Sequence, residues 1–389
     1  MYMLAVILLI SIAVIAAIDF YPQFNTWQSR IKIGRWHDKK QWTQAIALTA
    51  KRWLRKTPVI KLTDNNRIIV WDMLRGNYAR KAIQHWQEAA LIMGLTDYYA
   101  VTGDAKCRQE IDRFLSNNFT PQGRWKKTPL HVDGAIVAYA VLRLPWIDTK
   151  FYKPAFDSMY ALIQELTGAD GTVAYRKNLP NYRYVDTIGF ICPFLMRYGT
   201  EFNIPEATAL ACKQLISYSN HGMLYGSFLP CHTYNTETLL PAGLFGWGRG
   251  MGWFAIGLAD TYLEMPKDHP EIESIRHLMA QFARTALTFQ TRNGNWNWNV
   301  LNSHANPDSS ATATIAYFLQ VASSLPALQN EARHAVENAS KYLMRVTRRT
   351  GAIDLSQGDT KDIGVYSQEF NILPFTQGFA LRVACQTKA

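Results

Sequence analysis

Two aspartates stand at comparable places in the sequence, each at the start of a long apolar run. Asp133 lies in the segment His131-Val-Asp-Gly-Ala-Ile-Val, and Asp186 lies in Arg183-Tyr-Val-Asp-Thr-Ile-Gly-Phe. Two carboxyl groups that face one cavity can carry glycoside chemistry, because burial or a neighbouring charge keeps one of them protonated as an acid. The alternative is structural, since aspartates at helix starts commonly serve as N-caps or first-turn charges.

Aromatic and charged side chains also gather in the segments that precede the apolar runs. Rings stack on the C–H faces of sugars while polar groups hydrogen-bond to the hydroxyls, so such a set predicts a sugar-binding pocket. The set comprises Trp86, His131, Asp133, Tyr184, Asp186, Trp247, Arg249, Trp253, Trp296, Trp298 and Asp308. For each aromatic residue taken alone, a place in the hydrophobic core is an equally good interpretation.

The elements that must position these residues are helices, because helical periodicity dominates from about residue 40 onward. Relatively apolar helical stretches alternate with amphipathic ones, six of each kind. The apolar stretches lie near 85–102, 131–144, 186–199, 249–264, 308–324 and 374–384. The amphipathic stretches lie near 40–55, 105–118, 152–167, 205–219, 271–290 and 331–346.

This alternation predicts an all-α fold, a closed (α/α)6 barrel in which apolar helices form an inner ring and amphipathic helices face water. Gly103 and Asp104 read as the end of one helix and the N-cap of the next. The alternative is an open helical solenoid, but the sequence shows no repeat of fixed period. The loops that enter the inner helices should then meet at one end of the barrel.

Composition narrows the class of protein further. Hydrophobic residues make up 48% of the 389 residues, which suits one large domain with a buried core. The formal charge of +11 would attract anions such as acidic glycans, but no nucleic-acid-binding motif is present, so we expect no nucleic-acid partner. Five irregularly spaced cysteines predict neither disulfides nor a zinc site, and nothing predicts a cofactor.

The N-terminus is a separate segment. Residues 1–18 are almost wholly apolar and long enough for a membrane helix, so we expect an anchor over 1–20 and the barrel over 21–389. A cleaved signal peptide is the alternative, although no positive charge precedes the run and no Ala-x-Ala site follows it. We expect a single-pass anchor in a bacterial inner membrane, and the positive charges after the span only weakly favour a cytoplasmic barrel.

Four segments together resemble the unsaturated uronyl and rhamnogalacturonyl hydrolases, families 88 and 105 of the glycoside hydrolases. They are Asp133, Tyr184-Val-Asp-Thr with Cys192-Pro-Phe-Leu, Trp247-Gly-Arg-Gly-Met-Gly-Trp, and Ser309-Ser-Ala-Thr-Ala. The similarity runs through most of the chain after about residue 80. It implies an (α/α)6 barrel and metal-independent cleavage of a sugar chain that ends in a C4=C5 unsaturated uronic acid.

The resemblance also implies roles for the matching residues. Asp186 would protonate C4 and then act as the base toward water, while Asp133 would tune that acid or hold a ring hydroxyl. A second carboxylate and an apolar floor of Ile188, Phe190 and Ile191 would both raise the pKa of Asp186. Arg249 would hold the uronate carboxylate through a two-toothed contact. The remaining predicted substrate-binding residues are Trp86, Tyr184, Trp253, Trp247 and His131.

The chain departs from the family pattern at three places. Met251 stands between two glycines where the family usually has Asn, Gly226 replaces a histidine of many relatives, and Tyr175 replaces another. These groups help relatives to hold the uronate and its leaving sugar. His232 could substitute from the same loop, although we expect it on the surface.

Three hypotheses follow. The first is a membrane-anchored glycoside hydrolase that acts on an acidic glycan with Asp186 and Asp133. The second is a polysaccharide-biosynthesis or glycan-binding protein on the same barrel, placed beside machinery that makes or exports an exopolysaccharide or capsule. The third is an inverting glycosidase for a saturated sugar, whose carboxyl groups stand roughly 6.5–9.5 Å apart.

Overall fold

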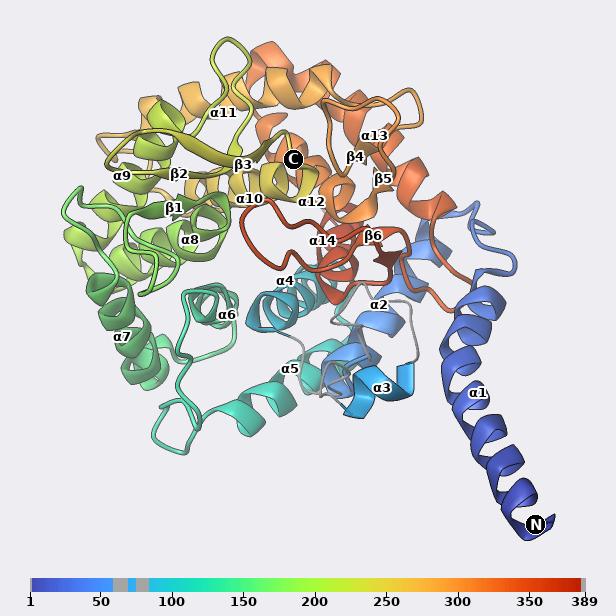
Figure 1. Ribbon diagram of the computed structural model, residues 1–389. Helices are drawn as coiled ribbons and strands as arrows, with labels where there is room; N and C mark the ends of the chain where they lie inside the picture. Colours follow the sequence, from blue (N-terminus) through green and yellow to red (C-terminus); the bar gives the residue numbers. More distant parts are fainter. Residues whose placement is uncertain (1, 59–68, 75–83, 386–389) are drawn as a thin grey trace.

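The computed structural model describes residues 2–58, 69–74 and 84–385, and it shows a ring of helices around a second ring (Figure 1). In this part of the chain, six inner helices alternate with six outer ones. The inner helices are α4 (His85–Thr102), α6 (Gly134–Leu142), α8 (Val185–Phe202), α10 (Gly248–Glu264), α12 (Ser309–Ala322) and α14 (Pro374–Cys385). The outer helices are α2 (Lys39–Arg55), α5 (Ala105–Asn118), α7 (Thr149–Glu165), α9 (Pro205–His221), α11 (Ile272–Thr288) and α13 (Gln329–Arg345).

The inner ring is closed, because each inner helix packs on the next and α14 packs on α4. At this last contact the two backbones touch: a Cβ added at Gly94 would lie 2.4 Å from the carbonyl oxygen of Gly378. A closed ring excludes the open solenoid and confirms the predicted six-hairpin barrel. Burial follows the predicted alternation, since every residue of α6 is buried while α13 buries only one face.

The predicted helix boundary at Gly103 is confirmed. Gly103 adopts a left-handed conformation with φ of 67° at the end of α4. Asp104 then caps α5 by accepting a hydrogen bond from the main-chain N–H of Lys106. The second inner helix begins later than expected, at Gly134 rather than near 131, because residues 131–133 form a turn.

Short strands decorate one end of the barrel, so the fold is not purely α-helical as predicted. They are β1 (Tyr182–Tyr184), β2 (Cys231–Asn235), β3 (Pro241–Phe245), β4 (Trp296–Asn297), β5 (Pro307–Asp308), β6 (Ser356–Gln357) and β7 (Phe370–Asn371). They pair antiparallel as β1–β2–β3, β4–β5 and β6–β7. Each lies in a loop that enters an inner helix, where neighbouring extended backbones satisfy one another's hydrogen bonds.

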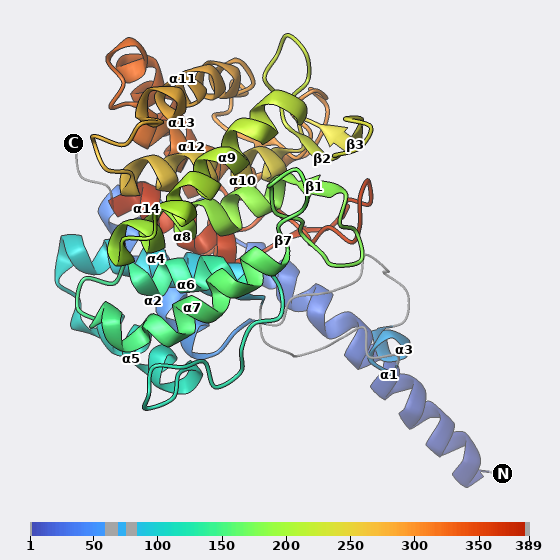
Figure 2. The same ribbon diagram turned by 90° about the vertical axis from the view of Figure 1, so that its left-hand side faces the viewer.

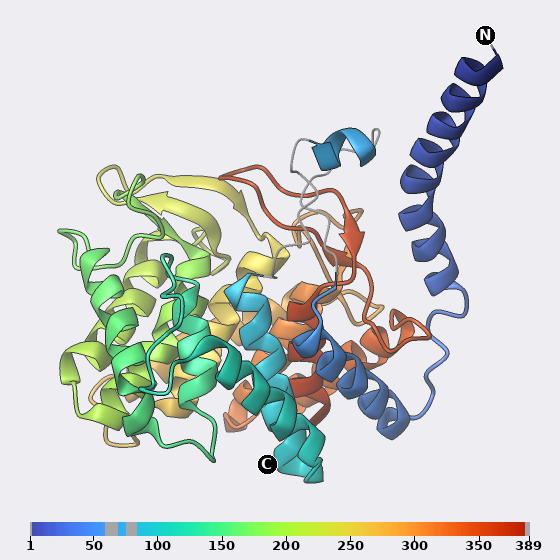
Figure 3. The same ribbon diagram turned by 90° about the horizontal axis from the view of Figure 1, so that it is seen from below.

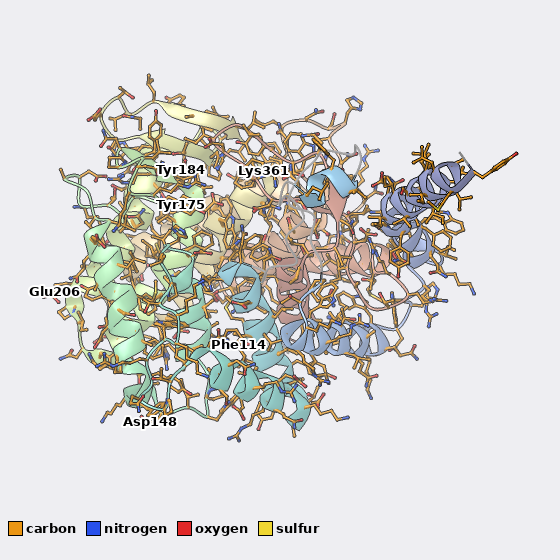
Figure 4. The ribbon with its side chains drawn as sticks, turned by 60° about the horizontal axis from the view of Figure 1, so that its bottom comes forward. Phe114, Asp148, Tyr175, Tyr184, Glu206 and Lys361 are labelled. Carbon is orange, nitrogen blue, oxygen red and sulfur yellow. The ribbon has the colours of Figure 1, made fainter. Side chains whose placement is uncertain are left out.

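The strands mark what we call the mouth end of the barrel, and the carboxyl ends of the inner helices mark the base end. Figure 4 shows Tyr175 and Tyr184 close together at the mouth end, whereas Asp148, at the start of an outer helix, lies at the base end. The base end is filled by a polar cluster in which Arg382 of α14 donates to both carboxylate oxygens of Asp260 of α10, each at 2.8 Å.

The remaining elements lie outside the two rings. They are α1 (Tyr2–Arg30), α3 (Ile69–Leu74) and a 3-10 turn (Pro326–Leu328). Helix α1 is apolar and long enough to cross a membrane, and no residue of it is buried. It extends beyond the anchor predicted over residues 1–20, of which Met1 lies outside the described residues.

Candidate active site

A cavity of about 570 Å³ opens at the mouth end of the barrel. The eight residues to which a catalytic or substrate-binding role was assigned from the family resemblance all line it, although they come from four different inner helices and their entry loops. They are Asp133, Asp186, Trp86, His131, Tyr184, Trp247, Arg249 and Trp253. The volume is within the range of small-molecule and sugar sites.

Asp186 is the second residue of α8 and does not cap the helix. The N-cap position belongs to Tyr184, which makes no side-chain capping bond. Oδ2 of Asp186 is buried and has no hydrogen-bond partner among the described residues. Burial therefore raises the pKa of Asp186 to about 7, against the lowering effect of Arg249. At neutral pH this carboxyl group is poised to give or take a proton.

The predicted causes of this raised pKa are partly corrected. Phe190 lines the cavity beside Asp186, but Ile188 and Ile191 are buried in the core and do not reach it. The neighbouring carboxylate that raises the pKa of Asp186 is Asp359, from the loop after β6. Desolvation by the apolar wall is thus the main effect, and the second negative charge comes from an unpredicted residue.

Asp133 occupies the N-cap position of α6 but makes no side-chain capping bond. Its Oδ1 is buried without a hydrogen-bond partner in the described part of the chain. Burial raises the pKa of Asp133, while His85 and His131 oppose that shift. Neither aspartate therefore makes a side-chain capping bond, although Asp133 stands at the N-cap of α6 and Asp186 is an acidic residue in the first turn of α8.

The prediction for His232, a residue of the cavity lining, differs most from the structure. We expected it on the surface, but it is buried on β2 with 3% of its area exposed, and its Nε2 lies 3.8 Å from Oδ2 of Asp186. Burial is the first cause that lowers the pKa of His232, to about 4, so the ring is neutral at pH 7. Its Nδ1 lies 3.2 Å from the hydroxyl of Tyr366, which fixes the ring's orientation.

Arg249 faces the cavity but already uses much of its guanidinium. Nη1 donates to the carbonyl oxygen of Gln357 at 2.6 Å, and Nη2 donates to that of Gly358 at 2.7 Å. Trp247 supports the same segment through a bond of 2.9 Å from Nε1 to Oε1 of Gln357. The structure thus gives both residues a task that the sequence did not indicate: they hold the loop after β6 against the pocket.

The aromatic residues form a continuous wall. Trp86 meets Trp253 edge to face with ring centroids 5.7 Å apart, and Trp253 packs against Phe190 at 4.6 Å. Tyr175 continues this row, with its ring centroid 6.1 Å from that of Phe190 and 4.8 Å from that of Tyr184. These rings serve both the core and the pocket, so the two interpretations of each aromatic residue are compatible.

Three residues of the predicted set lie elsewhere. Asp308 caps α12, where its Oδ1 accepts from the main-chain N–H of Ser310 at 2.8 Å. Trp296 is fully buried and donates from Nε1 to the carbonyl oxygen of Ala286. Trp298 packs near Tyr366, outside the cavity lining. Asp308 is therefore a helix cap, a role that had been considered only for Asp133 and Asp186.

The three departures from the family pattern do not have equal weight. Tyr175 lines the cavity, whereas Met251 is buried within α10 and does not line it. Gly226 lies in a turn with φ of 79°, and a Cβ built on it would meet no atom within 4 Å. Only the change at Tyr175 therefore alters the surface that a substrate would meet.

Several polar residues of the pocket were not predicted from the sequence. They are Asp359, Thr360 and Asp362 from the loop after β6, together with Gln84 and Arg176. The sequence does contain a pattern that could have predicted the residues of the loop after β6. Asp359, Lys361 and Asp362 precede the last apolar run, as the other chemically rich loops precede theirs. Among the described residues, no group of three or more His, Cys, Asp or Glu side chains is arranged to hold a metal ion.

A closed six-hairpin barrel has here an aromatic pocket with two carboxyl groups, each with one buried oxygen that lacks a hydrogen-bond partner among the described residues. This combination is that of the six-hairpin glycosidases. The family model of Glycosyl Hydrolase Family 88 matches residues 46–387, so the chain belongs to this family. Membership indicates a glycoside hydrolase. No curated protein sequence matches the chain.

Solved structures share the fold at low sequence identity. A possible member of glycoside hydrolase family 105 from Salmonella enterica is 17% identical with a TM-score of 0.74, and the match covers 90% of this chain and 94% of that one. A family 105 glycoside hydrolase from C. acetobutylicum is 17% identical with a TM-score of 0.68, and the match covers 82% of this chain and 97% of that one. The unsaturated glucuronyl hydrolase from Bacillus sp. GL1 is 16% identical with a TM-score of 0.64, over 89% and 96%.

Proposed function

We propose that the protein removes a terminal C4=C5 unsaturated uronic acid from an acidic glycan by hydration of the double bond. The observation that carries the proposal is Asp186 in the aromatic cavity: its pKa is raised to about 7, and its buried Oδ2 has no hydrogen-bond partner among the described residues. Its family and the unsaturated glucuronyl hydrolases among its structural relatives make this substrate class the natural choice.

In the proposed reaction, the protonated carboxyl of Asp186 gives its proton to C4 as the C4=C5 π electrons form the new C–H bond. Water then adds to C5 and loses a proton to the Asp186 carboxylate, which regenerates the acid. The hemiketal at C5 opens by cleavage of the bond from C5 to the ring oxygen, and the hemiacetal at C1 expels the neighbouring sugar as an alcohol. No metal enters any step.

Three neighbours would assist Asp186. The neutral ring of His232 can share the proton of Asp186 or orient the attacking water without adding a positive charge. Asp133, itself buried with a raised pKa, can accept a hydrogen bond from a ring hydroxyl or donate one. Trp86 would stack on the sugar ring, as the sequence predicted.

The uronate carboxylate requires a cation. Both terminal nitrogens of the Arg249 guanidinium already donate to main-chain carbonyl groups, so Arg249 has few N–H groups left for a uronate. Arg176 is the better candidate. It is exposed at the cavity, its guanidinium lies 5.2 Å from the ring centroid of Tyr175, and no ion pair ties it to another described residue. Arg249 would instead set the electrostatic potential around Asp186.

The decisive assay follows the ultraviolet absorbance of the C4=C5 bond in unsaturated oligosaccharides treated with wild type, Asp186→Asn and Asp133→Asn. We expect wild type to bleach the absorbance and Asp186→Asn to be nearly inactive. Turnover by Asp186→Asn at the wild-type rate would refute the mechanism. Tight glycan binding without turnover, over several uronate classes, would favour a binding or polysaccharide-synthesis role. The hydrogen bonds of Arg249 to the loop after β6 are compatible with that role, because they leave less of its guanidinium for a uronate.

We also propose that residues 1–20 anchor the barrel of residues 21–389 in a membrane. The support is the length and apolar character of α1, none of whose residues is buried. Resistance of the membrane-bound protein to alkaline carbonate is expected, and release by salt alone would refute the anchor.

A further inference from the structure

Helix α1 leaves the barrel on the side of the mouth. Figures 2 and 3 show the free N-terminal end of α1 projecting on the same side as the strands of the mouth end, away from the carboxyl ends of the inner helices. Because the two perpendicular views agree, a membrane crossed by α1 would lie before the mouth and not behind the base. This inference rests on the proposed anchor but not on the proposed reaction.

The direction of α1 is fixed by contacts at its end. Nε and Nη2 of Arg30 donate to the two carboxylate oxygens of Asp354 at 2.6 and 3.0 Å, and Nη2 also donates to the carbonyl oxygen of Phe370. Asp354 is fully buried and is paired with Arg348 as well, which lowers its pKa. A bidentate pair to a buried carboxylate holds the end of the helix to β7 and its neighbours.

The rim of the mouth exposes apolar side chains that form no part of the core. We define the rim set as Leu130, Leu239, Leu240, Leu301 and Val365, which are 74%, 49%, 64%, 52% and 52% exposed. They come from four different loops: the one before α6, the β2–β3 hairpin, the β4–β5 connection and the β6–β7 connection. Single exposed leucines are common on soluble proteins. Exposed apolar side chains at several neighbouring loop tips are instead typical of a surface that binds a membrane or another protein.

Helix α1 carries the matching signature of a membrane boundary. After its apolar run come four exposed aromatic residues, Phe20, Tyr21, Phe24 and Trp27. Aromatic residues of this kind favour the headgroup region of a bilayer. The axis between Asp19 and Arg30 is only about 16 Å long at the rise of an α-helix. The end of α1 that is bound to the barrel is therefore close to the bilayer surface, and so is the barrel itself.

Helix α3 also indicates that the membrane surface lies near the end of the apolar run of α1. Its Val70 N–H donates to Oδ1 of Asp19 at 3.3 Å, so α3 lies beside the end of the apolar run. Trp71 and Leu74 of this helix are exposed, at 55% and 75%. In Figure 3, α1 runs upward from the barrel to its free end. In this view α3 and the mouth strands both lie above the lower end of α1, where the helix joins the barrel.

We propose that the rim set seats in the headgroup region of the leaflet next to the barrel, so that the active-site mouth opens toward the bilayer. The occupant of this apolar surface is the lipid bilayer itself. The substrate would then be the end of a glycan held at the membrane surface, because such a chain can enter between the rim and the lipid headgroups.

The five native cysteines are all buried, which makes a single introduced thiol selective for labelling. The full-length protein is placed in lipid nanodiscs with an environment-sensitive fluorophore at Leu240→Cys or Val365→Cys on the rim. The matched controls are Leu263→Cys and Val101→Cys at the base ends of α10 and α4, which are similarly exposed at 52% and 50% in the wild type. Lipids that carry a spin-label quencher near the headgroup then report contact.

We expect several-fold stronger quenching at the rim than at the base, together with a blue shift of the rim probes. Equal quenching at the rim and the base, in protein that still resists carbonate extraction, would overturn the orientation and leave the anchor intact. A blue shift at the rim without quenching would assign the surface to a second protein copy or another protein, which also overturns the proposal. Release of the protein by carbonate would show that the anchor itself is wrong, and none of these readouts depends on catalysis.

Discussion

Two aspartates on neighbouring inner helices, the partly buried Asp186 on α8 and the fully buried Asp260 on α10, have opposite surroundings. Asp260 is fully buried at the base end and is satisfied on both oxygens, by Arg382 and by the hydroxyl of Tyr317. Asp186 lies at the mouth end, and its buried Oδ2 is unpaired among the described residues. The pKa of Asp260 is lowered by Arg382 against the effect of burial, whereas burial raises the pKa of Asp186 to about 7.

The difference teaches that burial alone does not make a carboxyl group reactive. At the base end, Asp97 and Arg143 extend the cluster around Arg382, so each charge there is compensated. Such a cluster holds the carboxyl ends of the inner helices together. At the mouth end the compensation is incomplete, and a proton can move at a pH close to neutral.

The largest effect is expected for Asp186→Asn, which removes the proposed acid without changing its shape. Turnover should fall by roughly 10²–10⁴, the usual contribution of general acid–base catalysis. The free energy of unfolding at pH 8 should be equal to or above that of wild type, because the variant no longer buries an unpaired charge. Steady-state kinetics and urea unfolding test both statements, and a large loss of stability would give Asp186 a structural role.

The opposite behaviour is expected for Asp260→Asn. Loss of one partner from a buried ion pair leaves Arg382 uncompensated, and unfolding should become easier by about 3–5 kcal/mol. Turnover per folded molecule should stay near that of wild type, since Asp260 lies at the base end. Urea unfolding with active-site titration measures the two quantities separately. Wild-type stability in this variant would contradict the account of the cluster.

The two carboxyl groups should also give pH dependences of opposite sign. Because the folded pKa of Asp186 is raised, its contribution to stability is present at low pH and is lost as the pH rises through about 7. The lowered pKa of Asp260 gives a contribution that is present above the ordinary carboxyl range and is lost as the pH falls below it. In parallel, kcat/KM should fall above pH 7 as Asp186 loses its proton, and an activity that is flat from pH 6 to 9 would contradict this assignment.

A smaller and more specific effect is expected for Arg249→Gln. Arg249 lowers the pKa of Asp186, so its removal should move the alkaline limb of the kcat/KM profile to higher pH. The matched control is Arg183→Gln. Arg183 is buried at the same end of the barrel but pairs with Asp170 and does not line the cavity, so its loss should lower stability and leave the limb in place.

Much of the barrel could be predicted from the sequence because its signal is local. The alternation of apolar and amphipathic stretches depends on residues a few positions apart, and the cap at Gly103 and Asp104 depends on neighbours in the chain. Asp133 and Asp186 could be predicted for the same reason, since each opens an inner helix. The short strands could not, because each is only two to five residues long, which is too short for an alternating pattern to stand out in the sequence.

The rest of the site depends on contacts between distant segments. Arg249 binds the main chain of Gln357 and Gly358, more than a hundred residues later, and nothing near Arg249 indicates that use of its guanidinium. His232 looked like a loop residue, yet β2 pairs with β1 through Thr233 and Tyr184 and brings its ring against Asp186. Asp308, in contrast, shows a true cap in a position that resembled a catalytic one.

The central claim is that Asp186 protonates a carbon atom, and the most direct measurement is deuterium transfer to C4. An unsaturated disaccharide is turned over briefly in D₂O, and the released uronic acid product is analysed by mass spectrometry and proton NMR at early times. We predict a carbon-bound deuterium at C4 with wild type and almost no product with Asp186→Asn. Release of the leaving sugar with the C4=C5 bond intact and no carbon-bound deuterium would contradict the proposed hydration.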